Sequence, residues 1–153
     1  MIKRYYAAPE VANTVWLFIV GWLLIAVPAM MAGEWERVIN VMIIVLIITY
    51  LIWLGAKYGT YIAIDEEKKI VGGKVHFIPG KEIPLSDVVE LEVQGSFAGV
   101  ITDIYMICRK KNGKLVERGL TSKQMLTKAD LKDLISTIHQ INPDIKIPEE
   151  LLR

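Results

Sequence analysis

The chain has 153 residues, 53% of them hydrophobic, and a formal net charge of +1. From residue 57 onward, 15 Lys and Arg face 14 Asp and Glu, and this balance does not predict nucleic-acid binding, which needs a basic excess. The single cysteine, Cys108, excludes an intrachain disulfide and with it a secreted, disulfide-stapled module.

Two apolar runs, residues 11–33 and 38–56, contain no charged side chain. At about 1.5 Å per residue, each is long enough to cross a hydrocarbon core of about 30 Å as a helix. Only residues 34–37 separate them, so the second helix must run back antiparallel to the first. The sequence therefore predicts a membrane helical hairpin. Because a second apolar run follows at once, we expect the first helix to be retained and not cleaved as a signal peptide.

The basic residues around the two runs predict the orientation of the hairpin. Lys3 and Arg4 precede the first run and Lys57 follows the second, whereas the connecting loop offers Arg37 alone beside two acids. By the positive-inside rule, both termini and the following domain are expected in the cytoplasm, at the inner membrane of the cell. Residues 1–10 are interpreted as an interfacial segment. The expected headgroup anchors are Lys3, Arg4, Tyr5, Tyr6, Trp35, Lys57 and Tyr58.

Three residues in the apolar runs are candidates for helix–helix packing. Ala29 and Gly33 lie four apart and would let another helix approach closely. Asn40, near the start of the second run, would hydrogen-bond to a partner helix or sit in the wet interface. Small residues four apart are also common in membrane helices without marking a contact.

The remainder has the alternating pattern of β-strands. A turn at residues 65–67 follows the first strand, and Gly72 and Gly73 are expected to interrupt the next one. Residues 95–99 are predicted as a loop and residues 111–114 as a type I′ hairpin turn. Strands are expected at residues 60–65, from 70, from 75 to an end at Pro79 and Gly80, and at residues 89–93, 104–109 and 115–120.

An amphipathic helix follows the strands. Thr127 is a candidate cap with Asp130 three residues on, and the helix is expected to stop before Asn142. Residues 144–153 are interpreted as a loosely held polar tail. The face predicted to cover the sheet carries Leu131, Leu134, Ile135, Ile138 and Ile141, and the opposite polar face carries Lys128, Lys132, Asp133, Thr137 and Gln140.

This order of elements, together with residues 61–65 (Tyr-Ile-Ala-Ile-Asp) and 83–93, where an Ile-Pro-Leu-x-Asp step leads into a strand, resembles bacterial pleckstrin-homology (PH) domain proteins. Several of those carry a two-helix membrane hairpin before the domain. The resemblance covers about residues 58–141, departs from the family between Gly99 and Asp103, and implies no catalytic residues. The expected fold is a membrane α-helical hairpin plus a mostly β, α+β cytoplasmic domain, a PH-like antiparallel barrel or sandwich capped by one C-terminal helix. The expected boundaries are 1–57, 58–142 and 143–153.

Groups that carry chemistry are sparse. His76 (expected in a strand), His139 (expected on the solvent side of the helix) and Cys108 are too scattered for a zinc site. Cys108 lies in the most apolar strand, which predicts a buried thiol of raised pKa and not a nucleophile. No Gly-x-Ser-x-Gly elbow is present. We therefore expect no enzymatic activity, no cofactor, no metal and no small-molecule substrate.

The function expected is a non-catalytic, membrane-anchored PH-like binding or scaffold module within a larger membrane assembly, whose partner is another membrane protein or a second copy. One alternative is an anionic-lipid sensor, and another is an accessory subunit of a membrane enzyme or transporter. Basic side chains at two turns carry the lipid alternative, although lysines also keep a hairpin edge soluble and unpaired. The candidate headgroup contacts are Lys68, Lys69, Arg109, Lys110, Lys111 and Lys114.

Overall fold

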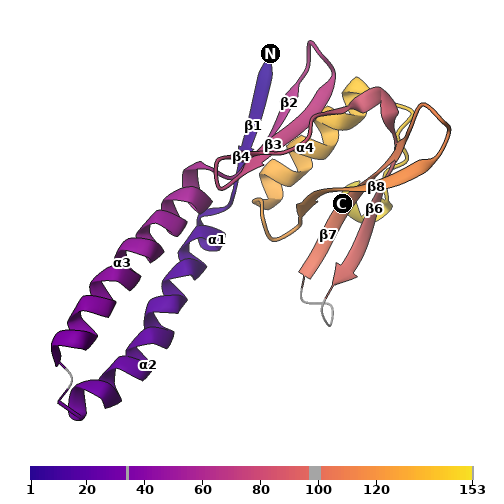
Figure 1. The fold of residues 1–153 in the computed structure, drawn as a ribbon. Coiled ribbons are helices and arrows are strands. Elements are labelled where there is room, and N and C mark those ends of the chain that lie inside the picture. Colours follow the sequence, from indigo (N-terminus) through magenta and orange to yellow (C-terminus); the bar gives the residue numbers. More distant parts are fainter. Residues whose placement is uncertain (34, 97–100, 153) are drawn as a thin grey trace.

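A computed structural model describes residues 1–33, 35–96 and 101–152, which form a helical hairpin and a β domain (Figure 1). In the first arm of the hairpin, a short helix α1 (Pro9–Asn13) and a 3₁₀ turn η1 (Thr14–Trp16) lead into α2 (Leu17–Met31). Gly33, with φ of +87°, ends this arm in the left-handed conformation that glycine adopts without strain. The second arm, α3 (Trp35–Tyr58), runs back beside the first, as predicted.

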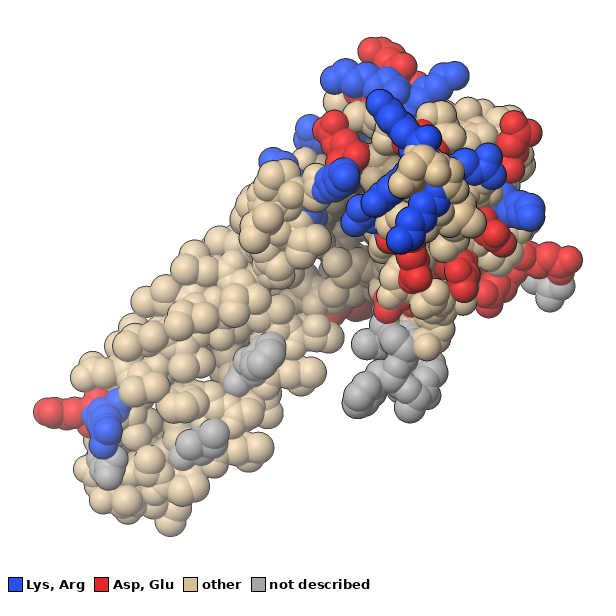
Figure 2. All heavy atoms as spheres, turned by 45° about the vertical axis from the view of Figure 1, so that its right-hand side comes forward, with Lys and Arg blue, Asp and Glu red and all other residues tan. Residues whose placement is uncertain are grey.

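Both arms are long and apolar enough to cross a membrane, over Pro9–Met31 and Trp35–Tyr58. In the most apolar window of each, only 12% and 17% of the residues are buried inside the molecule. A core helix of a soluble protein would be mostly buried, so this exposure favours lipid as the surroundings. Figure 2 shows the charged side chains gathered over the β domain and at the far end of the hairpin, with an uncharged surface between them.

The first sheet begins before the helices and resumes after them. Strand β1 pairs antiparallel with β2, in a register that runs from Ile2 opposite Asp65 to Tyr6 opposite Tyr61. β2 pairs with β3, which pairs in turn with β4 and β5. The chain thus leaves the sheet after β1, passes through the hairpin and returns as the neighbouring strand. These strands are β1 (Ile2–Tyr6), β2 (Tyr61–Asp65), β3 (Ile70–Val75), β4 (Ile78–Pro79) and β5 (Ile83–Pro84).

A second antiparallel sheet has the order β6-β7-β8, after the 3₁₀ turn η2 (Leu85–Asp87). Within the described residues no ladder joins the two sheets into a closed barrel, so the domain is two open sheets with helix α4 over them. Of the predicted loop at 95–99, Gly95 lies in β6, and residues 97–100 lie outside the described residues. The elements are β6 (Val88–Ser96), β7 (Ile101–Arg109), β8 (Leu115–Ser122), α4 (Lys128–Ile141) and α5 (Glu149–Leu152).

Helix α4 forms as its sequence predicts. The hydroxyl of Thr127 accepts a hydrogen bond from the Asp130 amide at 3.1 Å and caps the helix. Leu134, Ile135 and Ile138 are at most 1% exposed and fill the centre of the core between the sheets and the helix. Thr137, however, was expected on the solvent face and is only 3% exposed. It is buried because β1 lies over that side of α4.

The N-terminal strand is the main departure from the sequence interpretation, which placed residues 1–10 at the lipid headgroups. Tyr5 is 5% exposed and belongs to the core. Its hydroxyl donates a hydrogen bond to Asp133 Oδ2 at 2.7 Å and lies 3.3 Å from Thr137 Oγ1. Lys3 Nζ reaches the same two side chains at 3.5 and 3.2 Å. The interpretation of Tyr5 and Lys3 as headgroup anchors was therefore wrong, because β-pairing and α4 hold both side chains in the domain.

The segment predicted as a loose tail is also part of the domain. Ile145 and Leu151 are 3% and 6% exposed in the core. The backbone of Lys146 bridges to β6, donating to the Val89 carbonyl and accepting from the Leu91 amide. The prediction of a loose tail did not foresee that Ile145 and Leu151 are buried in the core, or that the Lys146 backbone forms these two hydrogen bonds with β6.

Two turn predictions were wrong. β3 runs unbroken through Gly72 and Gly73, which lie opposite Ala63 and Ile62 of β2. At residues 110–114 the hairpin forms, but only Gly113 has a positive φ (+79°), and its amide donates to the Lys110 carbonyl. This is a type I turn followed by a left-handed glycine, not a type I′ turn. The positive-φ pair instead falls on His76 and Phe77, so His76 lies in a turn and not in a strand.

Candidate functional site

A groove runs between the two arms of the hairpin, in the half nearest the β domain. Its volume is about 800 Å³. Gly21 leaves it open, because a Cβ built there would meet no atom of another part of the chain within 4 Å. The groove is lined by Thr14, Val15, Leu17, Gly21, Trp22, Val45, Ile48, Thr49 and Ile52.

Trp22, one of the residues that line the groove, carries an unpaired polar atom. The indole Nε1 is buried and has no hydrogen-bond acceptor among the described residues. An unpaired N–H in a membrane is costly, because hydrocarbon offers no acceptor. Sequence reasoning missed both Gly21 and Trp22; the only signal was a glycine interrupting a run of large apolar residues.

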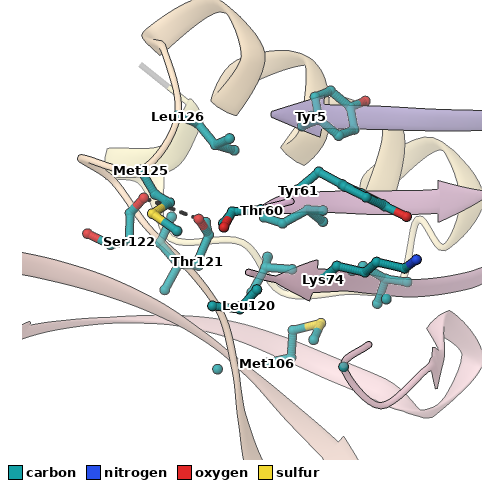
Figure 3. A pocket seen from close by; sticks show the side chains of 18 of the residues that line it. Tyr5, Thr60, Tyr61, Lys74, Met106, Leu120, Thr121, Ser122, Met125 and Leu126 are labelled. Atoms are coloured by element: carbon teal, nitrogen blue, oxygen red, sulfur yellow. Dashed lines mark hydrogen bonds between the residues drawn. The ribbon is translucent and has the colours of Figure 1, made fainter. Parts of the chain in front are cut away.

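A second hollow lies between the two sheets of the β domain (Figure 3). Its volume is about 450 Å³, within the range of roughly 300–1,000 Å³ for ligand-binding pockets. Tyr5 and Ile62 line it from the first sheet, and Met106 and Leu120 from the second. It extends to Thr60, at the junction with the helices. Because the two sheets do not close on each other, the domain offers an apolar space at the end where the hairpin begins.

Hydrogen bonds fix the junction between the hairpin and the β domain. The Ala8 amide donates to the Met125 carbonyl at 2.8 Å, and the Ala7 amide to the Thr60 carbonyl at 3.3 Å. The Thr60 hydroxyl, 5% exposed as a residue, donates to the Gly55 carbonyl in the last turn of α3. Both arms are thus tied to the sheet by hydrogen bonds, which fixes the direction in which the hollow faces.

The hydroxyl of Tyr5 shows how firmly β1 is held. Burial raises the pKa of Tyr5 to about 12, with the neighbouring Asp133 carboxylate adding to the shift. In return, the hydrogen bond from Tyr5 lowers the pKa of Asp133, and Lys3 adds to this effect. The hydrogen bond between Tyr5 and Asp133 therefore holds β1 against α4.

The predicted basic residues do not gather at the membrane end. Lys68 and Lys69 lie in the turn after β2, whose four residue steps from Tyr61 to Asp65 carry the chain about 13 Å away from the helices. Figure 1 places the turn between β7 and β8 at the same remote end. This turn carries Arg109, Lys110, Lys111 and Lys114. The arrangement gives no support to headgroup contacts and favours the reading in which these lysines keep exposed turns soluble.

The residues predicted to pack helices do not pair the two arms. Asn40 is exposed, and a Cβ built at Gly33 would meet no atom within 4 Å, while Ala29 is half-buried. The fully buried residues of the two arms, among those described, are Ala12, Ala26, Val38, Thr49, Gly55 and Ala56. Gly33 and Asn40 are therefore open to a partner chain, and Ala29 is open in part.

The remaining predicted anchors mark the ends of the hairpin. Lys57 Nζ lies 4.7 Å from the centre of the Trp53 ring and 5.0 Å from that of Tyr58. Trp35 is 56% exposed at the opposite end. Trp35 and Trp53 are eighteen residues apart, about 27 Å along a helix, close to the thickness of a hydrocarbon core. Arg4 and Tyr6, by contrast, lie against the Tyr61 ring on the outer face of the sheet.

Cys108 is buried in β7 at 8% exposure, as predicted, and His139 is exposed on α4. Burial raises the pKa of the Cys108 thiol, with Asp87 adding to the shift and Arg118 opposing it. No cluster of three or more His, Cys, Asp or Glu able to hold a metal occurs in the part of the chain that is described.

Labelling of Cys108 tests this burial. A thiol reagent at mildly alkaline pH is expected to modify the folded protein slowly and the denatured protein quickly, because only the exposed thiolate reacts. Mass spectrometry of the intact chain gives both rates. Fast labelling without denaturant would contradict the buried position of Cys108 in β7.

Comparison with known proteins adds no identification, because no protein family, curated protein or solved structure matches this chain.

Proposed function

We propose that this protein is a membrane-anchored, non-catalytic binding or scaffold module, and that it works as a subunit of a larger membrane protein assembly. The observation that carries the proposal is the apolar groove between the arms of the hairpin, which Gly21 leaves open and which Trp22 helps to line. Its β domain is proposed to be PH-like, with two open sheets and one helix over them.

The groove favours a protein partner over lipid alone. An acyl chain can fill apolar space, but it does not need the close backbone approach that Gly21 allows. A transmembrane helix does use it, because small residues let the backbones of two helices come together. We therefore assign the groove to a transmembrane helix of another membrane protein.

The proposed setting is the cytoplasmic face of the inner membrane. β1 and β2 are paired neighbours, so the first arm must begin and the second must end on the same side of the bilayer. Lys3, Arg4 and Lys57 lie on that side, and the positive-inside rule assigns it to the cytoplasm. Cleavage of the first arm as a signal peptide would remove β1 and Tyr5 from the domain core, which supports its retention.

Fixed attachment suits a scaffold. With the junction hydrogen-bonded at both arms, the hollow between the sheets stays at one height above the membrane and faces one direction. A partner helix seated near Thr14 and Ile52 would leave the membrane close to this hollow, so one partner can reach both surfaces. If the partner is a membrane enzyme or transporter, this protein is its accessory subunit and the partner carries the catalytic or transport activity.

Filling the groove is expected to release the partner. Gly21→Leu begins its side chain in open space, since a Cβ at this position meets no atom of another part of the chain within 4 Å, so the hairpin should fold while the partner helix is pushed away. Leu24→Phe is the matched control, because Leu24 is 75% exposed on the same helix and does not line the groove. Gentle extraction followed by native mass spectrometry should give a complex above the 17.3 kDa monomer for the wild type and L24F, and a monomer for G21L.

Two results would contradict this assignment. A wild-type protein that is monomeric after extraction in several mild detergents has no stable membrane partner. A complex that persists in Gly21→Leu uses another surface. If the complex contains only copies of this chain, the partner helix comes from self-association.

A further inference from the structure

A turn at the membrane end of the β domain exposes an unusual amount of apolar surface. Strands β3 and β4 are joined by His76 and Phe77, both with positive φ (48° and 67°), the pattern of a two-residue type I′ turn. That conformation normally selects Gly, Asn or Asp, so two bulky side chains here point to a constraint other than the turn. We call residues 75–78 the β3–β4 tip.

The β3–β4 tip is fastened to the end of α3. The Phe77 amide donates to the Gly59 carbonyl at 2.9 Å, and the His76 amide to the Thr60 hydroxyl at 3.1 Å. The two glycines of this segment admit the rings, because a Cβ on Gly55 would lie 2.6 Å from His76 Nδ1 and one on Gly59 would lie 2.8 Å from the Phe77 ring. The tip therefore sits at the level where α3 leaves its apolar segment.

The apolar side chains of the tip are nevertheless not covered by the molecule. Val75, Phe77 and Ile78 are 58%, 59% and 70% exposed. Tyr58, one residue before Gly59, is 54% exposed, and Lys57 lies against the Tyr58 ring. The tip thus adds apolar surface at the domain end of α3, where that helix carries the aromatic and basic residues typical of a membrane interface.

We propose that the β3–β4 tip inserts Val75, Phe77 and Ile78 into the interfacial layer of the bilayer, beside the helices, as a third point of attachment. Two helices fix the position of the domain in the membrane but leave its tilt dependent on the hairpin. A third apolar contact to one side of the hairpin fixes that tilt. The occupant of this surface is lipid, at the boundary between acyl chains and headgroups, because the tip is continuous with the membrane-crossing surface of α3. The inference rests on the membrane placement in the proposed function.

Quenching by brominated lipids tests the depth of the tip. In full-length protein with all four tryptophans replaced by Phe, a single tryptophan is introduced by Phe77→Trp, or by Ile78→Trp in case the turn rejects an indole at position 77. Vesicles of phosphatidylcholine brominated near the top of the acyl chains are the probe. Retaining native Trp53 alone is the positive control. Leu115→Trp is the negative control, because Leu115 is similarly exposed (55%) in the remote β7–β8 hairpin.

The expected result is a blue-shifted emission and a large loss of fluorescence for the tip probes, close to that of Trp53, with the Leu115→Trp emission unchanged. Tip probes that behave like Leu115→Trp while Trp53 is quenched would overturn the third attachment and leave the membrane placement standing. If Trp53 is not quenched either, the membrane placement itself fails, and this inference fails with it.

Discussion

Tyr5→Ala is expected to lower the free energy of unfolding of the β domain by about 3–5 kcal/mol, the usual cost of truncating a buried aromatic side chain. The ring is 5% exposed, and its hydroxyl joins β1 to Asp133 and Thr137 of α4. Tyr6→Ala, one residue on, is the control. Tyr6 is 44% exposed, and its ring lies 5.5 Å from that of Tyr61 across the strand pair in a tilted arrangement, so its loss should cost about 1 kcal/mol or less. Hydrogen exchange of the β2, β3 and α4 amides in the reconstituted protein measures both effects.

The same tyrosine predicts a dependence on alkaline pH. The pKa of Tyr5 is about 12 in the fold, against about 10 in the unfolded chain. Because the folded pKa is the higher one, the stability contributed by the neutral hydroxyl is complete below about pH 10 and is lost as the pH rises toward 12. Tyr5→Phe should remove this part of the alkaline loss. Equal exchange rates in Tyr5→Ala and Tyr6→Ala would show that residues 1–10 are the interfacial segment suggested by the sequence.

Ile145→Ala is expected to cost about 2–5 kcal/mol, although it lies in a segment of polar composition. Ile145 is 3% exposed in the core, and the neighbouring backbone of Lys146 bonds to β6 on both sides of Glu90. The cost should appear as loss of hydrogen-exchange protection in β6 and α4, because both contact this segment.

Lys146→Ala is the matched control for that prediction. Lys146 is exposed and contributes to β6 through its backbone, which alanine retains, so the change should stay within about 0.5 kcal/mol. If Ile145→Ala is as mild as Lys146→Ala, the C-terminal segment is the loose tail that its composition suggests.

Strand β1 and the C-terminal segment both fix the arrangement of the hairpin and the two sheets. β1 precedes the helical hairpin, and the chain returns from the hairpin directly into β2, so the sheet closes the base of the hairpin. The C-terminal segment holds the second sheet from the other side. The hollow between the sheets and the groove between the arms are therefore fixed relative to each other, which the proposed scaffold role requires.

The sequence alone determined those elements whose side-chain pattern and packing partners lie close together in the chain. The hairpin follows from two uncharged runs with a short link, and α4 from the Thr127 cap and the spacing of Leu134, Ile135 and Ile138. The burial of Cys108 follows from the apolar strand around it. In each case the side-chain period alone selects the structure, because the same residues form the element and its buried face.

Only the tertiary structure decided where long-range partners meet. Lys3, Arg4, Tyr5 and Tyr6 have the charge and aromatic character of a headgroup anchor, and their identity as a strand depends on β2, which lies more than fifty residues away. The left-handed turn is formed by His76 and Phe77, which lack turn signals, because Thr60 and Gly59, directly after α3, accept hydrogen bonds from their amides. The groove at Gly21 and Trp22 exists only once two helices lie side by side. A one-dimensional pattern carries the period of an element, whereas the partner that covers it is set by the packing of segments remote in the chain.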